Sequence, residues 1–349
     1  MNSWTARWRE FRLISATSAA PLLLLLLLAV APFFYRAVSP GASLRLSKVA
    51  ILVAFSGPLQ ARGNDLSAAI QIAVQHANAG DGRTLAVVSA LDDQGQTLAA
   101  SDQARGVAAD PGIHAVLCCT TAGALAAVAA LLPARESLIS LLGTPSTMPN
   151  AEATLLQRQF GSGAVVVLSD RTSPEDARAG TLAPALRSLG DTVNVVTADF
   201  ATGSNPDRVA EAVAQHEPSL VVLDMDYPAA AILAPALRTA GVHGPLVGDD
   251  RLDGAPAAAL LSSVGAVWYV ALDRDALLHQ TPTTFAGDFS RMRGHPPSGR
   301  DVLAYLQARV ALHTGVAPID PERLPLVLYQ IVPGVYPGRV GLSGGAGQP

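Results

Sequence analysis

The sequence has few charged residues, and this shortage excludes some classes of protein. Charged side chains make up 15% of the 349 residues, whereas soluble domains average roughly one quarter. The net charge is −4, and the basic residues form no cluster. A nucleic-acid-binding protein carries such a cluster on one face, so nucleic acid is excluded as a partner. The single lysine, Lys48, indicates a coding bias without functional content.

Cysteine is also scarce, since the chain has two cysteines and they are adjacent, Cys118 and Cys119. They cannot link distant parts of the fold, and disulfide geometry disfavours a bridge between neighbours. The chain is therefore not a disulfide scaffold. Its seven histidines are not placed at the spacings of zinc ligands. We predict neither a metal site nor a cofactor.

The amino terminus combines a basic segment with an apolar one. Residues 1–12 carry three arginines, and residues 13–35 are uncharged and mostly apolar. A membrane span needs about 20 such residues. The arginines before it predict that residues 1–12 lie in the cytoplasm and the main domain outside it, in the periplasm. Small-residue cleavage sites exist, but Pro32 and Pro40 follow them. We therefore expect an uncleaved signal anchor, with a cleaved signal peptide as the alternative, and a linker over residues 36–47.

The rest of the chain alternates strands and helices. Residues 49–55 are a continuous apolar run that ends at Ser56-Gly57-Pro58, which predicts a strand buried on both faces. Apolar residues at helical spacing follow, and Asn64 or Asp65 could cap that helix. The alternation restarts at Ala164. It predicts an α/β fold with two doubly wound, parallel-sheet (Rossmann-like) lobes.

We assign residues 48–148 and 275–324 to the first lobe and residues 149–274 and 325–340 to the second. Residues 341–349 form a flexible tail. The tail contains Ser343 in the pattern G-x-S-x-G. That hydrolase pattern requires a strand before the serine and a helix after it, and this tail provides no such helix. We predict no catalytic residue.

Polar residues and glycine follow two strands of the first lobe. Cys119, Thr120 and Thr121 stand where a helix begins, and Gly143 and Thr144 repeat the arrangement one strand later. Hydroxyls and free N–H groups at a helix start suit a carboxylate. The alternative is that the threonines only cap the helix.

Two residues of the second lobe also follow strands. Tyr227 and Asp250 stand at neighbouring strand ends, the edge at which open α/β sheets bind ligands. An acid there could hold an ammonium group through a charge-assisted hydrogen bond, and Tyr227 could cover an apolar part. The alternatives are a packed tyrosine and a loop acid.

Several of these segments resemble one family. Ser56-Gly57-Pro58, Gly63, Asp92-Asp93-Gln94 and Leu117–Thr121 resemble the branched-chain amino-acid (Leu/Ile/Val) binding proteins, the type I periplasmic solute-binding proteins of ABC transporters. The resemblance implies that the two first-lobe turns hold the α-carboxylate of a ligand. It implies that Tyr227 faces the ligand and that Asp250 binds its ammonium group.

The sequence departs from this family in two places. Residues 170–175 read DRTSPE where the family has a tyrosine–glycine pair, and residues 147–164 are too short for the crossover strand and helix. The resemblance implies capture of a small amino acid or amide for an ABC permease outside the cytoplasmic membrane. The alternative is a membrane-tethered sensing or interaction domain without transport.

Overall fold

A computed structural model describes residues 45–79, 84–132, 137–141, 148–170, 178–199, 203–312 and 325–332. The expected membrane segment at residues 13–35 lies outside this part. Within the described residues, no helix is both long and apolar enough to cross a membrane. Contacts divide the chain into residues 1–45 and a compact unit from Leu46 to Pro349. The fold described below belongs to that compact unit.

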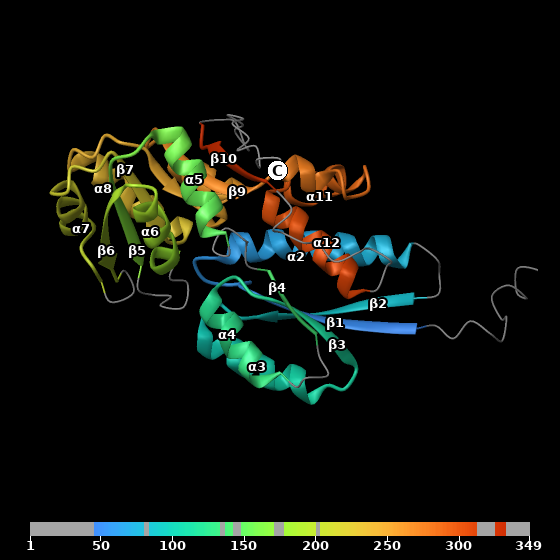
Figure 1. Cartoon of the computed structure of the whole chain (residues 1–349). Helices are drawn as coiled ribbons and strands as arrows, with labels where there is room; N and C mark the ends of the chain where they lie inside the picture. Colours follow the sequence, from blue (N-terminus) through green and yellow to red (C-terminus); the bar gives the residue numbers. More distant parts are fainter. Residues whose placement is uncertain are drawn as a thin grey trace, which may run out of the picture. The chain divides into compact units, whose positions relative to one another are not determined.

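The first sheet has the strand order β2-β1-β3-β4. Its parallel pairs include β1 with β3 and β3 with β4. The helices α2 and α12 lie against one of its faces, and α3 and α4 cover the other (Figure 1). These elements are β1 (Arg45–Val53), α2 (Gln60–Asn78), β2 (Thr84–Asp92), α3 (Thr97–Ala109), β3 (Ile113–Cys118), α4 (Ala122–Leu131), β4 (Ser137–Ser140) and α12 (Gly299–Ala311).

Strand β1 is buried on both faces, as its unbroken apolar run predicts. Val49, Ile51 and Val53 pack into the core shared with α2 and α12. Ala50 and Leu52 point the other way, into the core beneath α3 and α4. The alternation follows from the pleat, which turns successive side chains to opposite faces.

The second sheet has the strand order β10-β9-β8-β7-β5-β6. Its pairs are parallel except that β10 runs antiparallel to β9, which the predicted parallel pattern did not anticipate. Core residues of α5 and α6 pack on one face, and those of α7, α8 and α9 on the other. The elements are α5 (Pro149–Phe160), β5 (Ala164–Asp170), α6 (Arg178–Ser188), β6 (Thr192–Ala198), α7 (Pro206–Ala214), β7 (Leu220–Asp224), α8 (Tyr227–Thr239), β8 (Leu246–Gly248), η3 (Asp250–Leu252), α9 (Ala255–Leu261), β9 (Val267–Leu272) and β10 (Leu326–Gln330). Two helices between β9 and β10, α10 (Arg274–Leu278) and α11 (Phe285–Arg293), instead contact α12 and α2 beside the first sheet.

Two sequence-based expectations are wrong. Helix α2 begins at Gln60 without a side-chain cap, so Asn64 and Asp65 lie inside it. Its first turn is held instead by backbone bonds and by close packing on β1, where Gly63 meets the carbonyl of Ala54. The helix expected to be missing between residues 147 and 164 is present as α5, which begins with Pro149. Proline is favourable in the first turn of a helix.

Candidate functional site

Two aspartates at the end of β2 organise the loops at the carboxyl edge of the first sheet. Asp92 accepts hydrogen bonds from the backbone N–H of Phe55 and the hydroxyl of Ser56, at 2.8 and 2.6 Å. Burial raises the pKa of Asp92, but these bonds outweigh burial and hold it below its ordinary value. Asp92 therefore acts as a loop anchor between β1 and β2, with its carboxylate already engaged.

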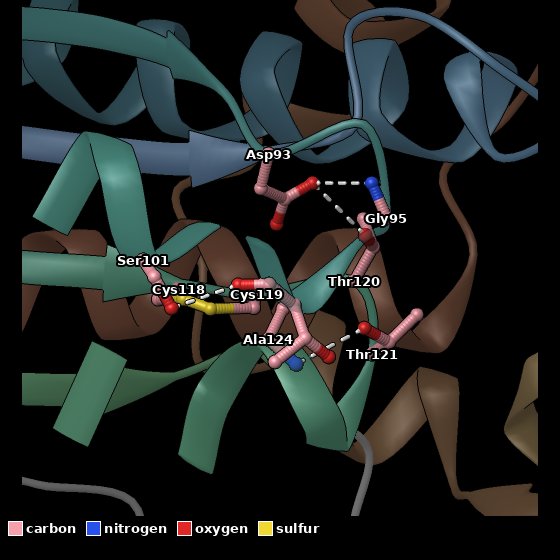
Figure 2. Close-up of a disulfide and its surroundings, with 9 residues drawn as sticks. Asp93, Gly95, Ser101, Cys118, Cys119, Thr120, Thr121 and Ala124 are labelled. Carbon is pink, nitrogen blue, oxygen red and sulfur yellow. Dashed lines mark hydrogen bonds between the residues drawn. A yellow bond between two sulfur atoms is a disulfide. The ribbon is translucent and has the colours of Figure 1, made fainter. Parts of the chain in front are cut away.

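Asp93 is fully buried and only partly hydrogen-bonded (Figure 2). Its Oδ1 accepts from the N–H of Gly95 at 2.8 Å and from the hydroxyl of Thr120 at 3.4 Å. Its Oδ2 has no partner among the described residues. Burial, the largest cause, raises the pKa of this carboxyl.

The adjacent cysteines form a disulfide, contrary to the expectation from geometry (Figure 2). The Cα atoms of Cys118 and Cys119 lie 3.2 Å apart across a cis peptide bond. Both residues are fully buried.

The predicted carboxylate-binding turn is occupied by internal contacts. Thr120 is buried against Asp93. Thr121 caps α4, since its hydroxyl accepts from the N–H of Ala124 at 3.4 Å. The capping alternative thus describes Thr121. The other half of the predicted site, Gly143 and Thr144, lies outside the described residues.

Tyr227 connects the two sheets. It begins α8, directly after β7, and its hydroxyl donates to the carbonyl of Pro58, which follows β1, at 2.9 Å. The guanidinium of Arg62 lies over its ring, 5.3 Å from the centroid. Arg62 also pairs with Asp226 at 2.6 Å. The carboxyl edges of the two sheets therefore meet at this point, with Tyr227 buried between them.

Asp250 lies at the end of β8 and is buried. Burial is the largest cause that raises its pKa, to about 6, and the nearby Arg300 cation opposes the rise. No hydrogen bond or ion pair engages its carboxylate within the described part of the chain. Of the sequence-predicted residues that the structure describes, Asp250 alone is a buried charged group without such a bond.

A network of buried charges lies beside Asp250, and sequence reasoning missed it. Arg178 of α6 donates to Glu152 of α5 and lies 3.5 Å from Asp249. Arg251 pairs with both Asp249 and Asp224, at 2.8 and 2.5 Å. Burial disfavours the Arg178 cation, but Glu152 and Asp249 outweigh burial and raise its pKa.

Nothing in the local sequence marks this network, because its members are distant along the chain. Within the network, Asp249 both caps a helix and pairs with a cation. It accepts from the N–H of Arg251 at the start of η3 and pairs with that arginine's side chain. The network ties α5, α6 and the ends of β7 and β8 together, so its role is structural.

One group of described residues could in principle hold a metal ion. Ligand atoms of Asp93, Cys118 and Cys119 lie within 4.8 Å of one another. A metal would need thiolates, and these sulfurs are joined in a disulfide. The donor set therefore does not fit a metal.

The fold is that of a type I periplasmic binding protein: two doubly wound α/β sheets whose carboxyl edges meet across a polar contact region. The chain belongs to the periplasmic binding protein family, since the family model matches residues 47–317. A search of curated proteins finds no significant match.

Solved structures of this fold resemble the chain over most of its length. The leucine-binding protein LivK of Thermotoga maritima has a TM-score of 0.69 at 15% identity, covering 83% of this chain and 96% of its own. LivJ of Streptococcus pneumoniae, in complex with isoleucine, has a TM-score of 0.61 at 17% identity, and the match covers 82% of this chain and 97% of LivJ. A solute-binding protein of R. palustris, in complex with benzoate, has a TM-score of 0.67 at 14% identity, and the match covers 82% of this chain and 93% of that protein.

Proposed function

We propose that this protein is an extracytoplasmic solute-binding protein that captures a small amino acid or amide and delivers it to an ABC importer. The observation that carries the proposal is the family match over residues 47–317. The solved relatives include proteins that bind isoleucine and benzoate. These ligands share a carboxylate and an apolar body, which sets the chemistry of the first panel to test.

The contact region between the two sheets supports the proposal. Ligands of open α/β sheets bind beyond the carboxyl ends of the strands. In this chain those ends carry a buried acid, Asp250, and a buried aromatic side chain, Tyr227. An acid without a hydrogen-bonding partner is suited to an ammonium group, and the tyrosine ring to an aliphatic one. Closure of the two sheets around the solute is the expected mechanism.

The basic amino terminus and the apolar residues 13–35 support a location at the outer face of the cytoplasmic membrane. An anchored protein would present the binding unit to a permease without diffusing away. The membrane-tethered sensor considered from the sequence differs from this proposal in its partner, and it would use the same solute site.

The test is calorimetric titration of the full-length chain in mild detergent with amino acids, their amides and aromatic acids. At least one member of the panel should bind. Asp250→Asn should weaken an ammonium-bearing ligand by roughly 10- to 150-fold, the effect of losing a charged hydrogen bond. Asp102→Asn is the matched control, because Asp102 is exposed on α3. A panel without any binder would defeat the proposal.

A further inference from the structure

The two sheets are joined to each other by bonds between the chain's own residues. Arg62, in the first turn of α2, pairs with Asp226 at 2.6 Å and also donates to the carbonyl of Arg251. The hydroxyl of Tyr227 donates to the carbonyl of Pro58 at 2.9 Å. Pro58 and Arg62 follow β1 of the first sheet, and the other three residues follow β7 or β8 of the second. Each of these bonds therefore crosses from one sheet to the other.

The pair between Arg62 and Asp226 opposes the local preferences of both helices. The N-terminus of a helix carries a partial positive charge, which disfavours a cation there, and Arg62 stands in a first turn that contains no acidic residue. Asp226 occupies the N-cap position of α8, where aspartate commonly accepts from the helix backbone, but its side chain makes no capping bond. The pair across the sheets thus accounts for two placements that neither helix explains.

The pair is shielded at one end and open to water at the other. The Arg62 side chain is 7% exposed, and its guanidinium lies over the ring of Tyr227, 5.3 Å from the centroid. The Asp226 side chain is 26% exposed. Salt screens such a partly buried pair less than an exposed one, and its hydrogen bond is charge-assisted. Because water reaches Asp226, the pair can open without leaving a buried carboxylate.

A recess beside this pair is nearly filled. Arg62 and Tyr227 line it, together with residues in the first turns of α9 and α12 such as Ala257 and Arg300. It offers about 10 Å³ of space to the centre of a water molecule, which is room for about one water. An amino acid does not fit into the recess in this arrangement of the sheets.

The course of the chain allows the two sheets to separate at this edge. The chain crosses between them after β4, after β9 and after α12, and crossings of this kind can act as a hinge. The bonds of Arg62 and Tyr227 lie instead at the carboxyl edges of the sheets. A bond from the N–H of Gly299 to Asp253, at 2.8 Å, also joins the two sides. Opening the hinge would break the side-chain bonds of Arg62 and Tyr227.

We propose that Arg62 and Tyr227 form a latch: their bonds alone hold the two sheets in contact, and a solute can enter between the sheets only when those bonds break. The inference goes beyond the proposed function, because it concerns what holds the sheets together and not which solute binds between them. A solute would then bind only the open fraction of the protein, and its apparent affinity would be lowered by that fraction.

The experiment measures the separation of the two sheets in the full-length protein in mild detergent, with no solute added. Spin labels are attached at Asp102→Cys on α3 and Glu211→Cys on α7, two exposed positions, one beside each sheet. Pulsed electron paramagnetic resonance gives the distance between the labels. The native cysteines are buried and joined in a disulfide, so they do not take up label. The wild type should give one narrow distance.

Removal of the latch should add a second distance. Arg62→Met removes the charge and keeps an apolar side chain, and the double variant with Tyr227→Phe removes all the side-chain bonds of the latch. Loss of the charged bond should raise the ratio of open to closed protein by about 10- to 150-fold. Asp226→Asn removes the same ion pair and serves if Arg62→Met does not fold, which melting temperatures check. Arg293→Met is the matched control, because Arg293 pairs with Asp65 at 2.6 Å beside the first sheet alone.

A wild type with several distances, or a double variant with the wild-type distance alone, would overturn the inference. The proposed function is tested separately by the solute panel, so either can fail without the other. A panel member that binds the wild type should bind Arg62→Met more tightly, by up to about 10- to 150-fold, because more of that protein is open. Weaker binding would show that Arg62 holds the solute instead of excluding it, and the latch would be wrong.

Discussion

The buried pair between Glu152 and Arg178 offers a quantitative test of the structure. Both side chains are essentially inaccessible, with exposed fractions of 0% and 1%. Within the described residues, Arg178 donates both hydrogen bonds that the Glu152 carboxylate accepts. Arg178 has more partners, since it also lies near Asp249 and donates to the carbonyl of Leu223. Removing the Arg178 cation should therefore lower the unfolding free energy more than removing the charge of Glu152.

Arg178→Met leaves a buried carboxylate without its cation, which costs about 3–5 kcal/mol of unfolding free energy. Glu152→Gln leaves Arg178 with Asp249 and a backbone acceptor, so we expect a loss of about 1–2 kcal/mol. The double variant removes both charges and should be more stable than Arg178→Met alone. At roughly 2–4 °C per kcal/mol, Arg178→Met should lower the melting temperature by roughly 6–20 °C.

The measurement is thermal and urea unfolding of the four proteins, with a pH series for Arg178→Met. Burial raises the pKa of Glu152, and the Arg178 cation opposes this. Without Arg178 the folded-state pKa rises further above the unfolded value. The stability deficit of that variant relative to the wild type should therefore be smallest at low pH and grow as pH rises.

Exposed Arg105, paired with Asp102 on α3, is the matched control, and Arg105→Met should change little. Additive effects in the double variant would refute the argument, because they would show that the two side chains are not coupled. An equal loss from both single variants would refute the asymmetry argued here.

Three further predictions concern packing, pH and topology. Gly63→Ala should destabilise the protein by about 1–3 kcal/mol, because its Cβ would lie 1.9 Å from the carbonyl oxygen of Ala54. Gly106→Ala in α3, where a Cβ meets nothing within 4 Å, should instead stabilise the protein by about 0.5–1 kcal/mol. A loss of stability at both sites in denaturant unfolding would contradict this prediction. Burial, the largest cause, raises the pKa of Asp301 from 3.8 to about 7, so its folded form holds a proton that the unfolded form releases. The contribution of Asp301 to the unfolding free energy should fall as pH rises between about 4 and 7. Asp301→Asn should therefore flatten that part of the plot of melting temperature against pH. An unchanged plot would show that Asp301 titrates normally. A reporter fused after Gly41 should be active only outside the cytoplasm, and activity inside the cell would exclude export.

Much of the fold could be predicted because it depends on local patterns. The predicted alternation of strands and helices is observed, because apolar periodicity and turn residues mark the ends of helices such as α3 and α9. The burial of β1 follows from its unbroken apolar run. Helix α5 could have been found from Pro149 in its first turn and the apolar residues that follow.

The polar groups were harder to predict, because their roles depend on distant neighbours. Thr121 caps a helix, as one of two local interpretations held. Thr120 is buried against Asp93, which follows β2, and Cys119 is in a disulfide, so their positions in the sequence did not reveal their partners. The prediction that these turns hold a carboxylate remains a prediction.

The sequence by itself determined the class of this protein. Its strand and helix periodicities are local, so they specified two doubly wound α/β units and most of their elements without any knowledge of tertiary contacts. Only the tertiary structure decided which charged side chains are buried and which remain incompletely paired. Arg62 meets Asp226 across 164 positions, and Arg300 reaches Leu141 across 159. A charge in a sequence is solvated or buried according to what packs over it, and folding alone brings those residues together.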